Sequence, residues 1–482
     1  MKKKLITIIL SLAMVCIFLA GCGSSGDSSY DDYKKEDSSK KKHNKEDKDS
    51  KEKTPYEKLF DNKNMMVMDE NNLIGYIDAS GEYVVEPQYT KARPYSCGYA
   101  AVYDADLRKW GYIDINGNMV IGYIYDDAHD FISDRALIQI DGNYGFIDTN
   151  GDYVLEPQYG YDSGMDYYQG YAAIHMNVPS PQGMDDFWSF VDIDGNILDG
   201  RYGNVFLYSG GVAFVSDMYD ATSDNLRMIN EQGETVGNYR YKISSYYGGN
   251  YYAYSSAASA KHVGFSNDRE FIEVVGVGYC YVDTNGNICG NVIDIEYPEY
   301  DILRVYPTVN GMYNVEIKRS EYTGDYRDSL NWYGLIDENG NWVMNPEYLY
   351  ITSKGNYLML GNSEYPHFYV LGDMDGNILH CYDEYEGYQM HFAEGNNIKY
   401  MPATDYEGRV GCLNVETGEI TIPFEYDYIG NPVSEGEGSY VIAVQNGLAG
   451  IMDLDGNWLI PPKFKQVNMG DYYVATGYGY AM

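Results

Sequence analysis

The sequence is poor in cysteine and shows no metal-type spacing among the cysteines it has. Seven cysteines occur in 482 residues, namely Cys16, Cys22, Cys97, Cys280, Cys289, Cys381 and Cys412. Two of them lie near the N-terminus, and the odd remainder is poor evidence for a disulfide framework or a zinc site. Cys280 and Cys289 flank one predicted turn, so a bridge between them depends on the size of that loop and stays open.

Recognisable catalytic signatures are missing as well. The chain has no Gly-x-Ser-x-Gly elbow, no phosphate-binding loop and no clustered Cys–His pair. The seven histidines are scattered without ligand spacing, at His43, His129, His175, His262, His367, His380 and His391. Spacing alone does not reveal an acid pair for glycoside hydrolysis among so many carboxylates. We therefore expect no enzyme, no metal site and no cofactor.

Positive charge is scarce beyond the N-terminal part. The formal net charge is −38, with 34 Lys+Arg and 72 Asp+Glu. Residues 1–55 contain 12 Lys and 9 Asp+Glu, so the remainder carries 22 basic against 63 acidic residues, or −41. A domain of this charge repels nucleic acid and anionic lipid surfaces. We expect no nucleic-acid partner.

Long helical stripes and long apolar runs are absent after the first 21 residues. No later run approaches the roughly 20 apolar residues that cross a bilayer. Turn signals recur about every 10 residues, which is typical of an all-β chain. Tyrosine is abundant, with 55 copies, and its amphipathic ring suits both strand faces and binding surfaces.

The N-terminus reads as a leader. Lys2-Lys3-Lys4 is a basic segment, Leu5 to Leu19 is apolar, and Leu19-Ala20-Gly21-Cys22 follows. This segment resembles the lipobox of bacterial lipoproteins. The resemblance implies that residues 1–21 are a signal peptide, that Cys22 receives a diacylglyceryl group, and that the mature protein is lipid-anchored at the extracytoplasmic face of the cell membrane. An ordinary secretory leader or an uncleaved anchor is the alternative.

Residues 22–55 are predicted to be a disordered tether. Residues 23–55 are mostly Ser, Asp, Lys and Glu with few apolar side chains, so they cannot bury enough surface to fold. A flexible coil of this length spans roughly 30 Å r.m.s..

Residues 56–482 contain about ten copies of one unit. In the copy at residues 333–348, an apolar run is followed by Asp337, the turn pair Asn339-Gly340, a second apolar run and Pro346. This pattern predicts strand, tight turn, strand and stop, with Gly340 at positive φ. A third strand precedes the hairpin in several copies. The equivalent turn glycines are Gly81, Gly117, Gly151, Gly195, Gly233, Gly286, Gly340, Gly376, Gly418 and Gly456.

These units resemble the WG (KWG) repeat of bacterial proteins. The resemblance rests on residues 435–464 and on Lys109-Trp110-Gly111-Tyr112-Ile113-Asp114, which holds the Trp-Gly pair. It implies a binding or interaction module without an assigned catalytic set. We expect tandem β-hairpin repeats of three to four strands. They form either a propeller-like ring or an open β-repeat array, since ten units exceed the usual four to eight blades.

Acidic residues recur in the turns, as in Asp-x-Asp-Gly-Asn at Asp192, Asp373 and Asp453. Calcium prefers six to eight oxygens, whereas only two acids precede each glycine before the strand resumes. Hairpin-turn chemistry explains the same residues, so we interpret them as turns rather than as a calcium site.

Three insertions interrupt the period, at residues 177–187, 241–262 and 318–331. Insertions in repeat arrays map to loops on which function collects. The second insertion predicts a binding surface of Tyr246, Tyr247, Tyr251, Tyr252 and Tyr254. The alternative is solvated decoration.

We therefore expect a lipid-anchored, non-catalytic binding or scaffolding module for a protein or cell-wall glycan partner. An extracytoplasmic ligand sensor or carbohydrate-degrading enzyme is the alternative. Met65-Met66-Val67-Met68 and residues 472–477 are each predicted to be the first strand of a unit, the strand that precedes the hairpin. The latter either covers the last unit or pairs across the joint of a ring.

Overall fold

The computed structural model describes residues 63–158, 160–220, 222–243, 269–293, 300–307, 312–321, 330–354, 357–362, 369–373, 377–382, 388–390, 400–405, 407–414, 416–430, 440–468 and 473–475, with residues 56, 60, 265, 295 and 297. This part of the chain is all-β, as predicted, with 37 strands in seven sheets. None of its helices is long and apolar enough to cross a membrane. Residues 1–55, with the predicted signal peptide, Cys22 and the tether, lie outside the described residues.

Five sheets have three to five strands each. The first contains, in spatial order, β3 (Tyr83–Tyr89), β2 (Ile74–Ile77), β1 (Met65–Met68), β36 (Gln466–Asn468) and β37 (Tyr473–Ala475). The second contains β4 (Tyr99–Asp104), β5 (Lys109–Asp114) and β6 (Met119–Tyr125). The third contains β10 (Tyr153–Leu155), β9 (Asn143–Asp148), β8 (Arg135–Ile140) and β7 (Asp127–Ala128). Two more contain β28 (Tyr388–Met390), β29 (Met401–Asp405), β30 (Val410–Leu413) and β31 (Ile420–Tyr426), and then β32 (Tyr428–Ile429), β33 (Tyr440–Gln445), β34 (Leu448–Asp453) and β35 (Trp458–Phe464).

Two larger sheets join several units. The ten-stranded sheet contains β11 (Tyr161–Tyr168), β12 (Tyr171–Ser180), β13 (Gly183–Asp192), β14 (Tyr202–Val205), β15 (Val212–Asp217), β16 (Leu226–Asn230), β17 (Thr235–Lys242), β18 (Arg269–Val274), β19 (Gly278–Asp283) and β20 (Ile288–Ile293). The seven-stranded sheet contains β21 (Tyr300–Pro307), β22 (Tyr313–Arg319), β23 (Asn331–Ile336), β24 (Trp342–Lys354), β25 (Tyr357–Asn362), β26 (Tyr369–Asp373) and β27 (Ile378–Tyr382). In both, strands of successive units pair with each other: β17 pairs with β18, and β24 pairs with β23 and then with β25.

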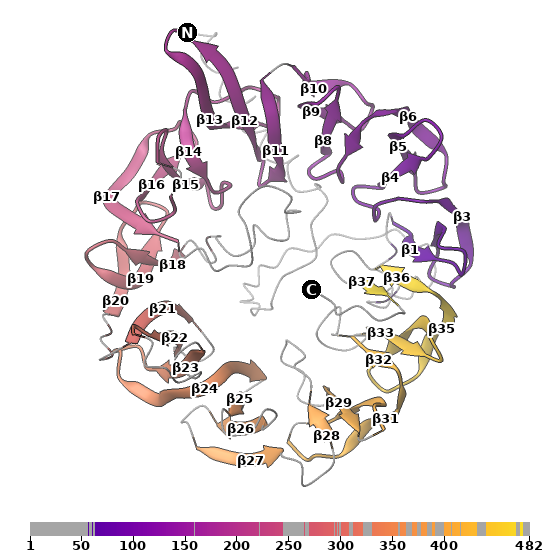
Figure 1. The fold of residues 1–482 in the computed structure, drawn as a ribbon, viewed down its shortest axis with the longest axis vertical. Coiled ribbons are helices and arrows are strands. Elements are labelled where there is room, and N and C mark those ends of the chain that lie inside the picture. The colour runs from indigo at the N-terminus through magenta and orange to yellow at the C-terminus, as the bar shows by residue number, and fades with distance from the viewer. Residues whose placement is uncertain are drawn as a thin grey trace, which may run out of the picture.

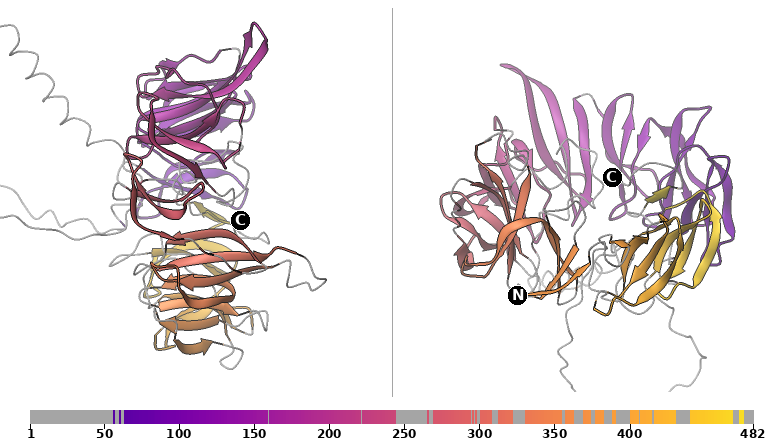
Figure 2. Two further views of the ribbon diagram at one scale, coloured as in Figure 1. Left: turned by 90° about the vertical axis from the view of Figure 1, so that its left-hand side faces the viewer. Right: turned by 60° about the horizontal axis from the view of Figure 1, so that its bottom comes forward.

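Nine of the ten predicted turn glycines lie among the described residues, and eight of them fall between two paired strands. Gly195 lies between β13 and Ile197, which bridges back to Val191. Figure 1 shows the units around a common centre, with β1, β4 and β33 nearer to it than β3, β6 and β35. Figure 2 (left) shows the same body from its side, where it is flatter. The arrangement is a propeller-like ring, one of the two predicted forms.

The ring is closed by the C-terminal end of the chain. β36 pairs antiparallel with β1, with Val67 opposite Val467. Across the same joint, the Lys465 amide donates to the Met68 carbonyl over 2.9 Å. The two ends of the chain do pair across the joint, but the prediction that residues 472–477 make this pairing is wrong, because β36 makes it. The reason is that a short first strand directly follows the last strand of the preceding unit, as β32 follows β31. β37 then pairs on β36.

The apolar core lies between successive units rather than inside each one. One cluster joins Tyr112 and Ile121 of the second sheet to Phe131 and Ile138 of the third. Turn glycines sit against the preceding unit: a Cβ on Gly117 would lie 2.7 Å from Val85 Cγ2, and one on Gly81 would lie 3.1 Å from Ile460 Cγ2. The first unit thus packs on the last as the second packs on the first.

Candidate functional site

The repeated turn aspartates organise the hairpins. Asp337 Oδ1 accepts the backbone amides of Asn339 and Asn341, each over 2.9 Å. Its Oδ2 accepts from Asn341 Nδ2 over 3.0 Å, and Gly340 has φ 81°, which confirms the predicted turn. These bonds to the carboxylate lower the pKa of Asp337, led by the side-chain bond from Asn341.

The same bonds recur in the predicted calcium-like loops. Asp192 Oδ1 accepts the amides of Asp194 and Asn196, and its Oδ2 accepts from Asn196 Nδ2. Asp453 is bonded in the same way to Asp455 and Asn457. Within the described ranges, no three His, Cys, Asp or Glu residues gather in a way that could hold a metal ion. Both carboxylate oxygens of Asp192 and Asp453 therefore already bond the turn itself.

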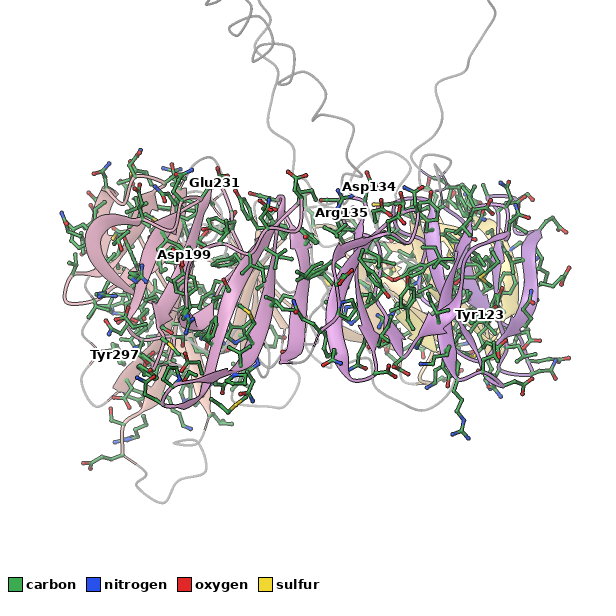
Figure 3. The ribbon with its side chains drawn as sticks, turned by 90° about the horizontal axis from the view of Figure 1, so that it is seen from above. Tyr123, Asp134, Arg135, Asp199, Glu231 and Tyr297 are labelled. Carbon is green, nitrogen blue, oxygen red and sulfur yellow. The ribbon has the colours of Figure 1, made fainter. Side chains whose placement is uncertain are left out.

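The turns share one face of the ring. Figure 3 shows Glu231, from the turn between β16 and β17, on the same upper face as Asp134 and Arg135. Arg135 Nε donates over 3.0 Å to the carbonyl of Ile193, in the turn of the next unit. Charged groups on this face therefore help to join neighbouring units.

The Trp-Gly pair has a packing role. β5 and β6 pair with an irregular register, so that Tyr112 lies opposite Ile121 and Trp110 opposite Tyr125. A Cβ on Gly111 would lie 2.6 Å from the Ile121 carbonyl oxygen, which is too close for any real side chain. The five equivalent glycines would meet a backbone oxygen at 2.4 to 2.8 Å, at Gly75, Gly145, Gly334, Gly411 and Gly450. The glycine is needed because the next strand crosses there.

Buried tyrosines tie the strands of a unit together. The Tyr95 hydroxyl donates to the carbonyl of the turn residue Asp114 over 2.7 Å. Tyr167 and Tyr208 make the same bond to Asp192 and Asn230, each over 2.8 Å. Burial raises the pKa of all three hydroxyls. Much of the tyrosine content therefore serves the fold.

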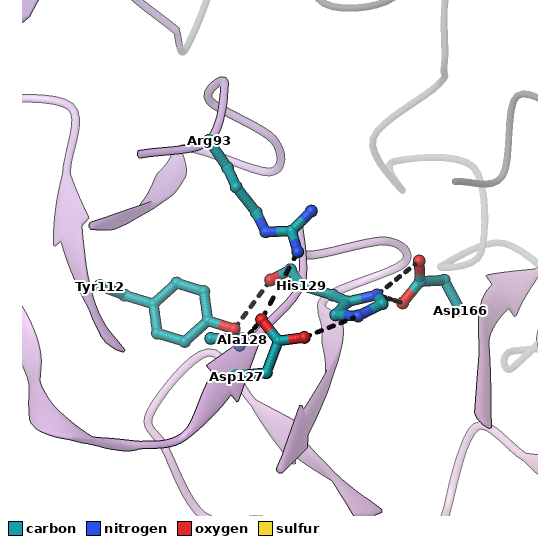
Figure 4. Close-up of polar contacts among 6 residues, drawn as sticks. All are labelled: Arg93, Tyr112, Asp127, Ala128, His129 and Asp166. Carbon is teal, nitrogen blue, oxygen red and sulfur yellow. Dashed lines mark hydrogen bonds and ion pairs between the residues drawn. The ribbon is translucent and has the colours of Figure 1, made fainter. Parts of the chain in front are cut away.

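A group of charged side chains, here named the inner-edge cluster, comes from three successive units. It consists of Arg93, Asp127, His129 and Asp166. Arg93 lies between β3 and β4, beside Ala92, which bridges to Val102. Asp127 and His129 lie in and just after β7, the edge strand of its sheet, and Asp166 lies in β11. Figure 4 shows the four side chains converging.

His129 lies between two carboxylates. Its Nδ1 is 3.0 Å from Asp166 Oδ1, and its Nε2 is 3.7 Å from Asp127 Oδ2. The other Asp127 oxygen is 3.6 Å from an Arg93 guanidinium nitrogen. The backbone carbonyl of His129 also accepts a hydrogen bond from the Tyr112 hydroxyl over 2.8 Å. The network therefore links three units through both side chains and backbone.

The two carboxylates keep His129 charged. Burial alone lowers the pKa of an imidazole, but the bonds to Asp127 and Asp166 outweigh it and raise the pKa of His129 to about 9. The bond from His129 in turn lowers the pKa of Asp127. A general base needs an unprotonated nitrogen near the working pH. Near neutral pH this imidazolium is suited to holding units together or to meeting a polar ligand, and not to taking a proton.

A second charged group is fully enclosed. Glu316 of β22 has no exposed surface and is paired with Arg304 of β21, whose Nε lies 2.5 Å from Glu316 Oε2. Asn331 Nδ2 donates to the other Glu316 oxygen over 2.6 Å. Such a pair is costly to break, and its place inside the unit gives it a structural role.

Several predicted site residues are not placed by the structure. Cys22 and the five tyrosines of the proposed surface, Tyr246, Tyr247, Tyr251, Tyr252 and Tyr254, lie outside the described residues. Cys280 is buried, Cys289 is partly buried, and no bridge joins them. The insertion at 177–187 is ordered as the distal part of the β12–β13 hairpin.

The inner-edge cluster was not found from sequence because its members are 34 to 73 positions from Arg93 and belong to different units. His129 appeared only as one of seven scattered histidines. The unit period is the one signal that could have aligned Arg93 with His129, because each lies four residues after the closing aromatic of β3 or β6, Tyr89 or Tyr125.

Comparison with known proteins finds the same repeat. Six segments match the family described as "WG containing repeat", at residues 74–104, 110–144, 144–177, 333–353, 411–448 and 450–472. No curated protein matches. Among solved structures, the computationally designed Ika8 protein is 9% identical, with 74% of this chain and 93% of that chain covered and a TM-score of 0.32. BamB from Moraxella catarrhalis is 13% identical, with 67% and 92% covered and a TM-score of 0.29.

Proposed function

Because the chain carries WG-containing repeats between residues 74 and 472, we propose that it is a non-catalytic binding or scaffolding module, lipid-anchored through Cys22 at the extracytoplasmic face of a cell membrane. Its partner is a protein or a cell-wall glycan.

One observation carries this proposal: the polar groups that repeat from unit to unit are used to build the frame. Turn carboxylates bond turn amides, tyrosine hydroxyls bond turn carbonyls, and His129 bonds carboxylates of its own and the next unit. A frame held in this way is a rigid support for loops that depart from the repeat, which is how many binding proteins present their contacts.

The lipid anchor has its own test. Replacing Cys22 with Ala should release the protein from membranes and stop the uptake of labelled fatty acid. Membrane association that is unchanged in the Cys22→Ala protein, without fatty-acid uptake by the wild type, would contradict the anchor.

Partner binding is tested by capture from the native cell surface with the full-length protein in non-ionic detergent. We expect saturable retention of a partner, and reduced retention when residues 244–264 are replaced by a short Gly-Ser linker. Isolated cell-wall glycan is incubated in parallel, and release of product from it would favour the carbohydrate-degrading alternative.

A further inference from the structure

The hairpin of β12 and β13 extends past its neighbours as a two-stranded ribbon. The two strands stay paired from Tyr171 opposite Asp192 to Ser180 opposite Gly183. On one side, the pairing of β11 with β12 ends at Tyr161, which lies opposite Met176. On the other, β14 meets β13 only at Trp188. Figures 1 and 2 show the ribbon projecting from the ring.

The ribbon is held in its extended form from both faces. On one face, His175 Nε2 lies 2.7 Å from Asp186 Oδ1, and the His175 ring lies 4.9 Å from the Trp188 ring. On the other face, Arg201 pairs with Asp185 over 2.5 Å and lies over the Phe187 ring at 4.7 Å. A strand fixed before binding loses little conformational entropy when a ligand pairs with it.

The two edges of the ribbon differ. In an antiparallel pair, residues alternate between those that bond the partner strand and those whose backbone groups point away from it. The Asn177 amide points away, because it donates to the Gly160 carbonyl over 2.7 Å. Two residues further on, Pro179 has no N–H. The β12 edge is therefore occupied at one outward position and lacks a donor at the next.

The edge of β13 between its turn and Trp188 carries outward backbone groups that no described strand bonds. Asp186 lies opposite Asn177 and Met184 lies opposite Pro179, so their backbone groups also point away from β12. The next residue of this class, Trp188, pairs with Tyr202 of β14. Within the described part of the chain, Met184 and Asp186 pair with no third strand. This edge offers two N–H donors and two carbonyl acceptors two residues apart, which is the spacing of one extended strand.

The side chains along this edge define the chemistry of the strand that fits. Met184 is 51% exposed and offers an apolar contact, while the Asp186 side chain is 67% exposed and negatively charged. Two copies of the edge paired in register at Asp186 would bring their Asp186 carboxylates together, and like charges across a sheet destabilise pairing. A basic strand has no such conflict, and the acidic domain attracts it.

We propose that the edge of β13 at Met184 and Asp186 binds an extended segment of a partner protein as an added strand, with an apolar side chain and a Lys or Arg side chain two positions apart on the face that carries Met184 and Asp186. This inference deepens the proposed binding function and rests on it. The main-chain hydrogen bonds between β13 and the added strand supply affinity, and Asp186 selects for the basic side chain.

The test uses a capped heptapeptide in which threonine stands at every second position and valine and lysine alternate between the threonines, so that valine and lysine share one face. It is titrated into the full-length protein in non-ionic detergent by isothermal titration calorimetry. We expect one saturable site and at least tenfold weaker binding of the same peptide with glutamate in place of lysine. A peptide N-methylated at alternate residues lacks the N–H donors along one of its edges, so it cannot pair with β13 through that edge. We expect it to bind at least tenfold more weakly too.

Two variants separate strand pairing from charge attraction. Met184→Pro removes one outward N–H and copies on β13 the proline that β12 already has, so the fold should tolerate it; binding should fall at least tenfold. Met184→Leu keeps the N–H and an apolar side chain, and binding should stay unchanged. An unaltered circular dichroism spectrum and melting curve confirm that both variants are folded.

The inference is overturned by equal binding of the N-methylated peptide or by wild-type binding in the Met184→Pro protein, since either means attraction by charge alone. Dimerisation of the protein that Met184→Pro abolishes would assign the edge to a second copy instead. If the peptide fails while the native partner is still captured, this inference falls and the proposed binding function stands.

Discussion

The glycine of the Trp-Gly pair offers a direct test at the scale of one residue. Gly111→Ala brings a methyl group within 2.6 Å of the Ile121 carbonyl oxygen, whereas Gly122 in the same hairpin has nothing within 4 Å of an added Cβ. We expect Gly111→Ala to lower the free energy of unfolding by about 2–4 kcal/mol through backbone displacement. Gly122→Ala is the matched control and should change it by less than about 1 kcal/mol. Thermal and urea unfolding measure both, and equal effects would refute the packing explanation.

The charge on His129 predicts a pH dependence. The pKa of this imidazole is about 9 in the folded protein, against an ordinary value of 6.5 in the unfolded chain. Its stabilisation is therefore complete below pH 6.5 and is lost as the pH rises through about 9, by up to about 3 kcal/mol. Tyrosine ionisation does not interfere in this range, because tyrosine titrates near pH 10.

Urea unfolding of the wild type and of His129→Gln at pH 6, 7.5 and 9 measures this dependence. The wild type should lose stability as the pH rises, while the variant should be less stable at pH 6 and show a weaker slope. A slope that is the same in both proteins would mean that the inner-edge cluster contributes nothing in this range.

Single-residue roles were only partly predictable from sequence. Asp337 and Gly340 act through neighbours two to four positions away, so their turn was predicted correctly. Arg93, Asp127 and Asp166 meet only because the ring brings three units together, and no local pattern encodes that meeting.

At the scale of the element, the tyrosine that bonds a turn carbonyl is the repeated connection. Tyr95, Tyr167 and Tyr208 make this bond, and Phe131 has the corresponding place in the third sheet, four residues before its first long strand, β8. Since one unit is built without the hydroxyl, the ring itself tolerates its loss.

Tyr167→Phe should therefore lower the free energy of unfolding by about 1 kcal/mol, the usual worth of one buried hydrogen bond, without changing the circular dichroism spectrum. Tyr219→Phe is the control, because Tyr219 is 92% exposed. A Tyr167→Phe protein as stable as the control would show that the bond contributes nothing.

Strands and turns were predicted well because the unit repeats its hydrophobic and turn pattern ten times. Their connection was not predictable to the same degree. β24 runs for 13 residues through Pro346 and joins two units into one sheet, although a proline ordinarily ends strand pairing. The strand pairs with β23 from Trp342 to Tyr348, across the proline, and with β25 from Tyr348 onward. The change of partner therefore happens at Tyr348, two residues after the proline that was interpreted as a stop.

At the scale of the whole molecule, the joint between the two ends of the chain is the place where the ring could open. Val67 of β1 and Val467 of β36 are almost fully buried in one shared cluster with Tyr440 and Ile451. Deleting residues 466–482 would uncover the edge of β1 and this apolar surface, which invites pairing between molecules.

We expect the protein without residues 466–482 to self-associate in size-exclusion chromatography with light scattering. Deleting residues 476–482 alone leaves β36 and β37 in place and should leave the protein monodisperse. A shorter protein that elutes and resists protease like the full chain would show that β36 does not close the ring.

The sequence did not decide between a ring and an open array, because both forms use the same unit. The number of units did not decide it either, since ten exceeds the usual four to eight blades of a propeller. The distinction lies in a few long-range contacts. Lys463 Nζ donates over 2.8 Å to the carbonyl of Gly81, 382 positions away, and no local pattern predicts a contact at that separation.

The closure by β36 also sets an order of events in time. β1 is among the first strands to be synthesised, and its partner β36 follows nearly 400 residues later. At ordinary translation rates of 5–20 residues per second, that interval is roughly 20–80 s. During it each later unit has an earlier unit on which to pack, while the first waits with the edge of β1 unpaired. The first unit to be synthesised is thus the last to become native, and its open edge needs protection from pairing with other chains for the longest time.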